Sequence, residues 1–209
     1  NAAVALATLG TPLQGAAAIH AEQDDDIVVG AASAIGATTV TLTSTANLAA
    51  APLSTKDGIA EGYLIVNDEA GEGQMYKIKA HDALSGTSNA VFTLYDNLII
   101  ALDTTSQVGL IQHPCANVVA SKAVMTNVFT GIPLLPITAS YYFWAQMAGP
   151  APAICNATLV KGTRVVIGTT AAKVDPAADV TTEIAIGYPL TLGVTAGDEY
   201  FMVMLCGNW

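Results

Sequence analysis

Alternating apolar and polar residues recur in short runs along most of the chain. In "QMYKIKA" (residues 74–80), Tyr76 and Ile78 fall on one side and Lys77 and Lys79 on the other. Successive side chains of a β-strand point to opposite faces, so this run predicts a half-buried strand with one solvated side. Similar runs, rich in β-branched or aromatic residues, also predict strands. They are "TTVTLT", "GYLIVND", "AVFTLYD", "QVGLIQ", "RVVIGT", "TEIAIGYPLTLGV" and "DEYFMVMLC".

Turn residues separate these runs. Between "LIVND" and "QMYKI" lies "EAGEG", in which Gly71 and Gly73 can supply the positive φ that a hairpin connection often needs. Asp68, Glu69 and Glu72 lie at its tip and could hold a cation, but we favour an ordinary solvated hairpin. Close spacing of strands and turns is typical of a small barrel or sandwich. We therefore predict an all-β fold of two small β modules, sandwich or barrel-like, with an extended N-terminal arm and little helix.

Residues 1–25 are predicted to form that arm. They are rich in Ala, Gly and Thr and show no regular apolar period, so neither a helix face nor a strand face can be assigned. We expect this arm to be extended or partly helical and, if ordered at all, to be ordered by a neighbour. It ends at three adjacent acids, Asp24 to Asp26, which lack the alternating ligand spacing of a calcium loop and indicate a solvated turn. The first β module is predicted to span residues 26–121.

A stretch with several prolines separates the two predicted modules. Pro133 and Pro136 each remove a backbone donor and fix φ. Residues 122–138 are therefore interpreted as a linker rather than a central strand. The remaining residues, 139–209, are predicted to form a small C-terminal module that resembles a β-barrel.

Four consecutive aromatic residues, Tyr141 to Trp144, open this second module in a chain that is only 6% aromatic. If "YYFWAQM" is one strand, Tyr141 and Phe143 share one face, and Tyr142 and Trp144 share the other. We expect the Phe143 face to be core. For Tyr142 and Trp144 three locations stay open: a subunit or module interface, the core of their own module, or a platform on which a ligand stacks.

Composition and charge narrow the classes of partner. Hydrophobic residues make up 52% of the chain and charged residues 11%, against about 25% charged in typical globular domains. Part of the apolar surplus is therefore expected to face another protein. The net charge of −10, with no basic patch, argues against nucleic acid as a partner and favours a neutral or positive protein surface. No apolar run approaches the ~20 residues of a membrane-spanning helix, so no membrane partner is expected.

Candidate catalytic groups are few. The three cysteines, Cys115, Cys155 and Cys206, are odd in number and lack C-x-x-C spacing, so we interpret them as buried, reduced thiols. His113 lies near Cys115, but the two residues match no known nucleophile and base signature. Motifs for phosphate, dinucleotide and serine-hydrolase chemistry are missing from the sequence. We expect no enzyme activity, cofactor or metal, and a hydrolase that uses His81 or His113 is the weakest alternative.

Several stretches together resemble a known family. They are "EGYLIVNDEAGEGQMYKIKAH", "FTLYDNLIIALDTTSQVGLIQHPCANVV", "YYFWAQMAGPAPAICNATLVKGTRVVI" and "IAIGYPLTLGVTAGDEYFMVML". From about Gly62 to Leu205 the chain resembles the capsid decoration, or cement, proteins of tailed bacteriophages. The odd set of cysteines and the apolar N-terminal arm depart from the usual traits of that family.

The resemblance implies a non-enzymatic virion protein that is made in the bacterial host cytoplasm and binds the outer surface of the capsid. Its implied partners are the major capsid protein and copies of itself, as a homotrimer. The alternative function is a head fibre, or a host- or carbohydrate-binding module on the virion, whose exposed aromatic residues contact the ligand. The residues that we expect at a protein interface are Tyr142, Trp144, Pro12, Leu13 and Ile19.

Overall fold

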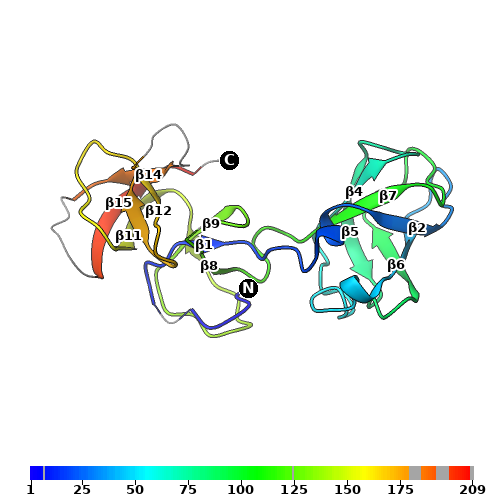
Figure 1. Cartoon of the computed structure of the whole chain (residues 1–209), viewed down its shortest axis with the longest axis horizontal. Coiled ribbons are helices and arrows are strands. Elements are labelled where there is room, and N and C mark those ends of the chain that lie inside the picture. The colour runs from blue at the N-terminus through cyan, green and yellow to red at the C-terminus, as the bar shows by residue number, and fades with distance from the viewer. Residues whose placement is uncertain (7, 124, 179–184, 192–197, 208–209) are drawn as a thin grey trace. The chain divides into compact units, whose positions relative to one another are not determined.

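The computed structural model describes residues 1–6, 8–123, 125–178, 185–191 and 198–207. The chain forms two compact units. Unit 1 combines Asn1–Ala17 with Pro114–Trp209, and unit 2 is Ala18–His113. Strands dominate both units (Figure 1), which confirms the predicted all-β fold.

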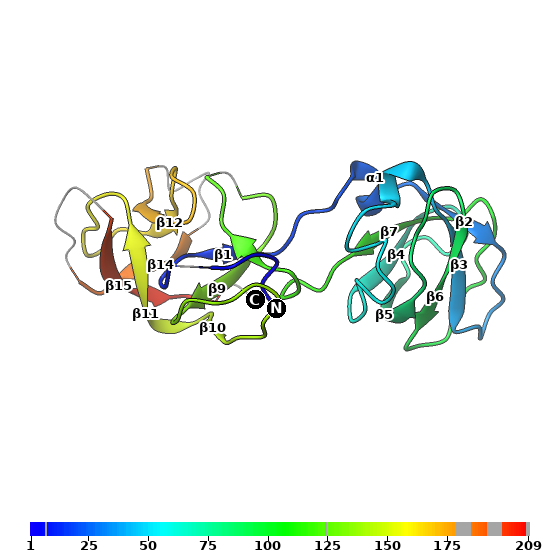
Figure 2. The same cartoon turned by 90° about the horizontal axis from the view of Figure 1, so that it is seen from below.

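Unit 2 is a closed barrel with the strand order β2-β3-β6-β5-β4-β7, and its neighbouring strands pair antiparallel. Helix α1 packs beside β7 and lies at one end of this barrel (Figure 2). The element bounds are α1 (Ala21–Asp24), β2 (Ile27–Ala31), β3 (Thr39–Thr43), the 3-10 helix η1 (Ala46–Leu48), β4 (Tyr63–Asp68), β5 (Met75–His81), β6 (Asn89–Leu94) and β7 (Gln107–Ile111).

Alternating side chains of these strands fill the barrel. In β5, Tyr76 and Ile78 are buried while Lys79 is exposed, as the sequence pattern predicts. The connection from β4 to β5 is the predicted hairpin, with a φ of +89° at Gly71 and +84° at Gly73. Each buried aliphatic side chain contributes about 1.5 to 3 kcal/mol relative to an exposed one. The barrel core includes Ile27, Val29, Val40, Leu42, Leu64, Val66, Ile78, Phe92, Leu94, Val108 and Leu110.

Unit 1 contains a four-stranded antiparallel sheet and a second closed barrel. The sheet has the order β10-β9-β1-β8, with β1 (Leu13–Gln14), β8 (Val119–Ala120), β9 (Phe129–Pro133) and β10 (Ala145–Gln146). The barrel has the order β11-β13-β12-β14-β15, with β11 (Gly149–Cys155), β12 (Val165–Ile167), β13 (Val174–Pro176), β14 (Ala185–Pro189) and β15 (Glu199–Leu205). Ile132 of β9 belongs to the barrel core, so one hydrophobic cluster spans the sheet and the barrel.

The N-terminal segment is not an arm ordered by a neighbouring molecule, and this part of the prediction is wrong. Leu13 is fully buried in a small core with Ala2, Leu6 and Val118. The backbone N–H of Leu6 donates to Ile137 at 2.8 Å, and β1 pairs with both β8 and β9. The segment is therefore ordered by its own unit. Its two-residue strand is too short to give a period in the sequence.

The predicted linker, residues 122–138, also needs correction because it contains β9. This strand pairs with β1 on one side and β10 on the other, which makes it a central strand. Pro133 is its last residue, so the missing N–H affects only the strand end. The backbone of Gly131 has a φ of +110° beside a register shift opposite β1. The boundary between units lies at residues 17–18 and 113–114 instead of near residues 25 and 121.

Candidate protein-interaction site

The aromatic run Tyr141 to Trp144 lies outside any strand, and only Ala145 and Gln146 of "YYFWAQM" form a strand, β10. Ser140, directly before the run, has a φ of 66°, a left-handed conformation that interrupts extended structure. The backbone of Tyr141 is held at both polar groups: its N–H donates to Thr138 and its carbonyl accepts from Ala2, each at 3.3 Å. The loop is therefore fixed to the N-terminal segment of unit 1.

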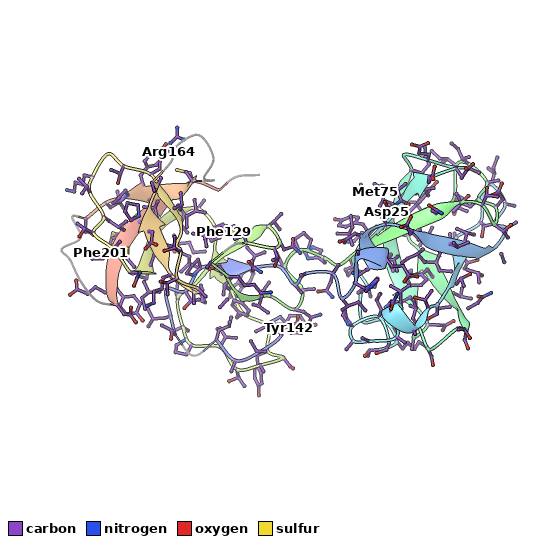
Figure 3. The ribbon with its side chains drawn as sticks, in the orientation of Figure 1. Asp25, Met75, Phe129, Tyr142, Arg164 and Phe201 are labelled. Carbon is purple, nitrogen blue, oxygen red and sulfur yellow. The ribbon has the colours of Figure 1, made fainter. Side chains whose placement is uncertain are left out.

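The side chains of this loop are mostly on the surface. Tyr141 is 65% exposed, Tyr142 is 87% exposed and Trp144 is 95% exposed, and Tyr142 is labelled in Figure 3. Only Phe143 packs, as a partly buried residue, against the small core around Leu13. The predicted core position of Tyr141 is wrong. The alternative that places Tyr142 and Trp144 in the core of their own module is also wrong.

The loop forms one wall of a pocket of about 290 Å³ in unit 1. Three residues that line the pocket are buried in strands or next to one: Leu13 is 0% exposed, Val118 is 3% exposed and Thr130 is 3% exposed. The other lining residues are Asn1, Cys115, Phe143, Trp144, Ala145 and Met147. The small core around Leu13 therefore does not fill the space beneath the aromatic loop.

The pocket has a consistent chemistry. None of its described lining residues is Asp, Glu, Lys, Arg or His. The hydroxyl oxygen of Thr130 is buried and has no hydrogen-bond partner within the described chain. A buried hydroxyl without a partner is costly, and this oxygen is not exposed to the pocket. Asn1 and Cys115 add polar groups to the otherwise largely apolar lining.

The five residues predicted at an interface fall into three groups. Tyr142 and Trp144 are on the surface, whereas Pro12 and Leu13 are buried inside unit 1. Ile19 is half-buried and packs against the core of unit 2. Pro12 and Leu13 are therefore covered by their own chain, because β1 is a central strand rather than an exposed arm. Sequence reasoning missed Thr130, Val118 and Met147, which come together only through long-range pairing of β1, β8 and β9.

A second apolar surface lies on the outside of the unit 1 barrel. Tyr188, Tyr200 and Met202 are 44%, 47% and 48% exposed. Met202 lies opposite Pro152 in the β11–β15 pair, and Tyr188 lies opposite Met204 in the β14–β15 pair. The described strands thus present apolar side chains on this face.

Charge is divided unequally between the units. Unit 2 contains twelve acidic and three basic residues, a formal charge of −9 at neutral pH. Unit 1 contains five acidic and four basic residues, a formal charge of −1. The unit that carries the exposed aromatic loop is therefore nearly neutral, whereas unit 2 is strongly acidic.

Two of the titratable groups that could do chemistry, His81 and Cys155, are buried. His81 is 2% exposed, and burial lowers its pKa. Cys155 is buried, and burial raises the pKa of its thiol. Cys115 and Cys206 are exposed, so the expectation that all three thiols are buried is wrong. In the described ranges, no three His, Cys, Asp or Glu side chains lie close enough to hold a metal ion.

No helix in the described part of the chain is long and apolar enough to cross a membrane. Comparison with known proteins adds no relative to this description. The sequence matches no protein-family model and no curated protein, and the structure matches no solved structure.

Proposed function

We propose that this protein is a non-enzymatic structural component of a tailed-phage virion. It binds the outer surface of the capsid as a decoration protein and stabilises the shell, and its docking surface is the aromatic loop of unit 1. The resemblance of the sequence to decoration proteins motivates the proposal. The single observation that supports this docking surface is the 95% exposure of Trp144 beside the exposed Tyr142.

Exposure of these rings has an energetic consequence. Fully burying a large apolar side chain contributes about 1.5 to 3 kcal/mol of free energy. Because Trp144 is exposed in the protein alone, its burial free energy is available for binding a partner. Trp and Tyr are also the residues most enriched among those that dominate protein–protein affinity. Their polar groups suit a partly hydrated contact. The loop therefore has the properties of a docking surface for a neutral protein face.

The distribution of charge between the units also supports docking through unit 1. A partner that approaches unit 1 meets a module of net charge −1, whereas unit 2 carries −9. Docking through unit 1 does not require the acidic side chains of unit 2 to be buried, and burying unpaired charges would be costly. Repulsion between acidic modules also disfavours nonspecific association.

We extend the proposal to a homotrimer, with the major capsid protein as the external partner. The outer face of the unit 1 barrel, with Tyr188, Tyr200 and Met202, is the candidate contact between copies. Stable interfaces of standard size bury about 800 Å² per partner. Analytical ultracentrifugation tests this part: a trimer supports it, and a monomer at every accessible concentration contradicts it.

Capsid binding is tested separately by co-sedimentation. Purified protein is mixed with capsids stripped of it, and the bound fraction is measured against protein concentration. Saturable binding supports the proposal, and absence of binding overturns it.

The second candidate function is a head fibre or a carbohydrate-binding module on the virion. The exposed rings of Tyr142 and Trp144 favour it, because aromatic faces also stack on ligands. A glycan array distinguishes the two functions. A strong signal that is lost in Trp144→Ala, without saturable capsid binding, would favour the carbohydrate function.

A further inference from the structure

The residues that lead into the aromatic loop are held by the N-terminal segment of unit 1. Leu6 and Ile137 exchange two backbone hydrogen bonds, because each N–H donates to the carbonyl of the other residue, at 2.8 Å and 2.9 Å. The N–H of Ser140 donates to the carbonyl of Ala2 at 2.9 Å, and the N–H of Ala2 donates to Tyr141 at 3.3 Å. Two points of this segment therefore fix the start of the loop.

The side chains of the same two residues support the loop from below. Ala2 is 1% exposed and Leu6 is 4% exposed, and together with one residue of β1 and one residue next to β8 they form the small hydrophobic cluster of unit 1. Phe143 of the loop packs against this cluster. We call residues 1–6 the N-terminal strap, since this segment holds both the backbone before the loop and the ring of Phe143.

The two ends of the loop are held by different parts of the chain. After the loop the chain enters β10, which pairs with β9. Before the loop, the described backbone hydrogen bonds from residues 134–141 to another segment all go to Ala2 or Leu6. Ser140 also has a left-handed φ of 66°, a conformation that persists only where the surroundings hold it. Detaching the strap would therefore free the loop at its upstream end.

Order in the loop matters for binding. A surface that is already in its bound conformation loses less conformational freedom when a partner docks. Fixing the backbone of a single residue corresponds to about tenfold in affinity. On a loop without the strap, the exposed rings of Tyr142 and Trp144 would carry this cost for each residue that becomes mobile.

We infer that the N-terminal strap positions the aromatic loop for docking and that Leu6 is a positioning residue. The inference rests on the proposed function for the docking event that the loop serves. Leu6 is buried, so it acts on docking through other residues. It holds the backbone of Ile137, and its side chain belongs to the cluster on which Phe143 rests.

Amide hydrogen exchange of the full chain tests the strap without capsids. The N–H groups of Leu6, Ile137 and Ser140 all lose their acceptors when the strap detaches, so they are expected to exchange through one opening event. Their protection factors should then agree within about threefold. Much faster exchange at Ser140 than at Leu6 would show that the loop moves independently of the strap, and this result would overturn the inference.

Leu6→Ala and Leu159→Ala are matched variants. Each removes most of a buried leucine side chain from unit 1, but Leu159 belongs to the separate cluster of the barrel. Gly168, whose N–H is bonded within the β12–β13 hairpin, is the reference amide of the barrel. Leu6→Ala should lower the protection of Ile137 and Ser140 relative to Gly168 by at least about tenfold, and Leu159→Ala should not lower this ratio.

Capsid affinity distinguishes positioning from general stability. Co-sedimentation is done at a temperature below the thermal midpoints of all variants. Leu6→Ala should bind at least about tenfold more weakly than wild type, and Leu159→Ala should bind as wild type does. Leu6→Ile conserves side-chain volume and should recover most of the affinity. If Leu6→Ala does not fold, Leu6→Val makes a smaller deletion and should change protection and affinity in the same direction.

The outcomes separate the strap from the proposed function. Wild-type affinity in a Leu6 variant with a mobile loop would overturn the inference. An equal loss of affinity in Leu6→Ala and Leu159→Ala would also overturn it, because general destabilisation would then explain both losses. If wild-type protein does not bind capsids, the proposed function fails, and hydrogen exchange alone decides whether the strap holds the loop.

Discussion

The backbone N–H of Ile59 donates a hydrogen bond to Nε2 of His81 at 3.0 Å inside unit 2. Nδ1 of His81 lies 2.7 Å from the carbonyl oxygen of Asp82, so Nδ1 carries the proton and Nε2 is the acceptor. The ring also stacks on Phe92, with centroids 4.9 Å apart. Protonation of Nε2 would place two donors against each other, so this arrangement requires neutral histidine.

Stability of unit 2 should therefore depend on pH through His81. Burial lowers its folded-state pKa below the ordinary value of 6.5, although the carbonyl of Asp82 and the charges of Asp57 and Asp82 act in the opposite direction. The contribution is fully present above the unfolded pKa of about 6.5 and is lost as pH falls through the folded pKa. Urea unfolding from about pH 8 to about pH 5.5 should show this loss.

The matched variants for this prediction are His81→Gln and His20→Asn. His20 caps α1 by accepting from the N–H of Glu22, and asparagine is also a good N-cap residue. The glutamine variant should lose the pH-dependent component, and the His20 variant should keep it. Equal pH dependence in wild type and His81→Gln would contradict the assignment.

Thr130→Val should stabilise unit 1. The buried hydroxyl makes no hydrogen bond in the described structure, and such a group carries a desolvation penalty of about 1 to 3 kcal/mol. Valine keeps the β-branched shape that suits β9. We expect the free energy of unfolding to rise by about 1 kcal/mol, measured by denaturant titration.

Thr163→Val is the control for this substitution. The hydroxyl of Thr163 donates to the carbonyl of Val160 at 2.6 Å, so its removal should reduce stability by about 0.5 to 1.5 kcal/mol. A loss of stability in both variants would show that Thr130 has a partner that the described contacts do not include.

Gly109 is a position where one added carbon should destabilise unit 2. A Cβ at this residue of β7 would clash with the carbonyl oxygen of Asp24, at the end of α1. Backbone atoms cannot yield as a flexible side chain does, so Gly109→Ala should cost about 1 to 3 kcal/mol. Gly36→Asn is the comparison, because its site is open and its φ of +86° is tolerated by asparagine. A thermal midpoint of Gly109→Ala equal to that of wild type would refute the close approach.

The strands of unit 2 could be predicted from the sequence, whereas most of the sheet in unit 1 could not. Tyr76 and Ile78 alternate with lysines along β5. This alternation can be recognised in the sequence without knowing which strands pair with β5. Leu13 lies in a two-residue strand whose partners are more than a hundred residues away. Long-range strand pairing therefore determines the burial of Leu13, and no local pattern in the sequence predicts it.

The candidate site shows the same contrast. Trp144 could be singled out because four aromatic residues are adjacent in the sequence. Its exposure could not be predicted, since "YYFWAQM" has the composition of a strand and the left-handed φ of Ser140 has no strong signal in serine. Thr130 gave no signal at all, because a hydroxyl becomes notable only when the fold buries it without a partner.

Salt should strengthen the proposed capsid binding. In the proposed array of copies on a shell, acidic modules of −9 each would repel one another, and salt screens this repulsion over a Debye length of about 10 Å at 0.1 M. Contacts through the near-neutral unit 1 change little with salt. Apparent affinity in co-sedimentation should therefore rise between about 20 and about 200 mM NaCl. A steep fall in affinity would instead indicate ionic docking through unit 2.

The most direct measurement of the central claim is the capsid affinity of Trp144→Ala, compared with Ile99→Ala. Both side chains are exposed, at 95% in unit 1 and 67% in unit 2, so neither substitution should change the thermal midpoint appreciably. Co-sedimentation with stripped capsids should show at least about tenfold weaker binding for Trp144→Ala and wild-type binding for Ile99→Ala. Wild-type affinity of Trp144→Ala would contradict docking through the aromatic loop of unit 1.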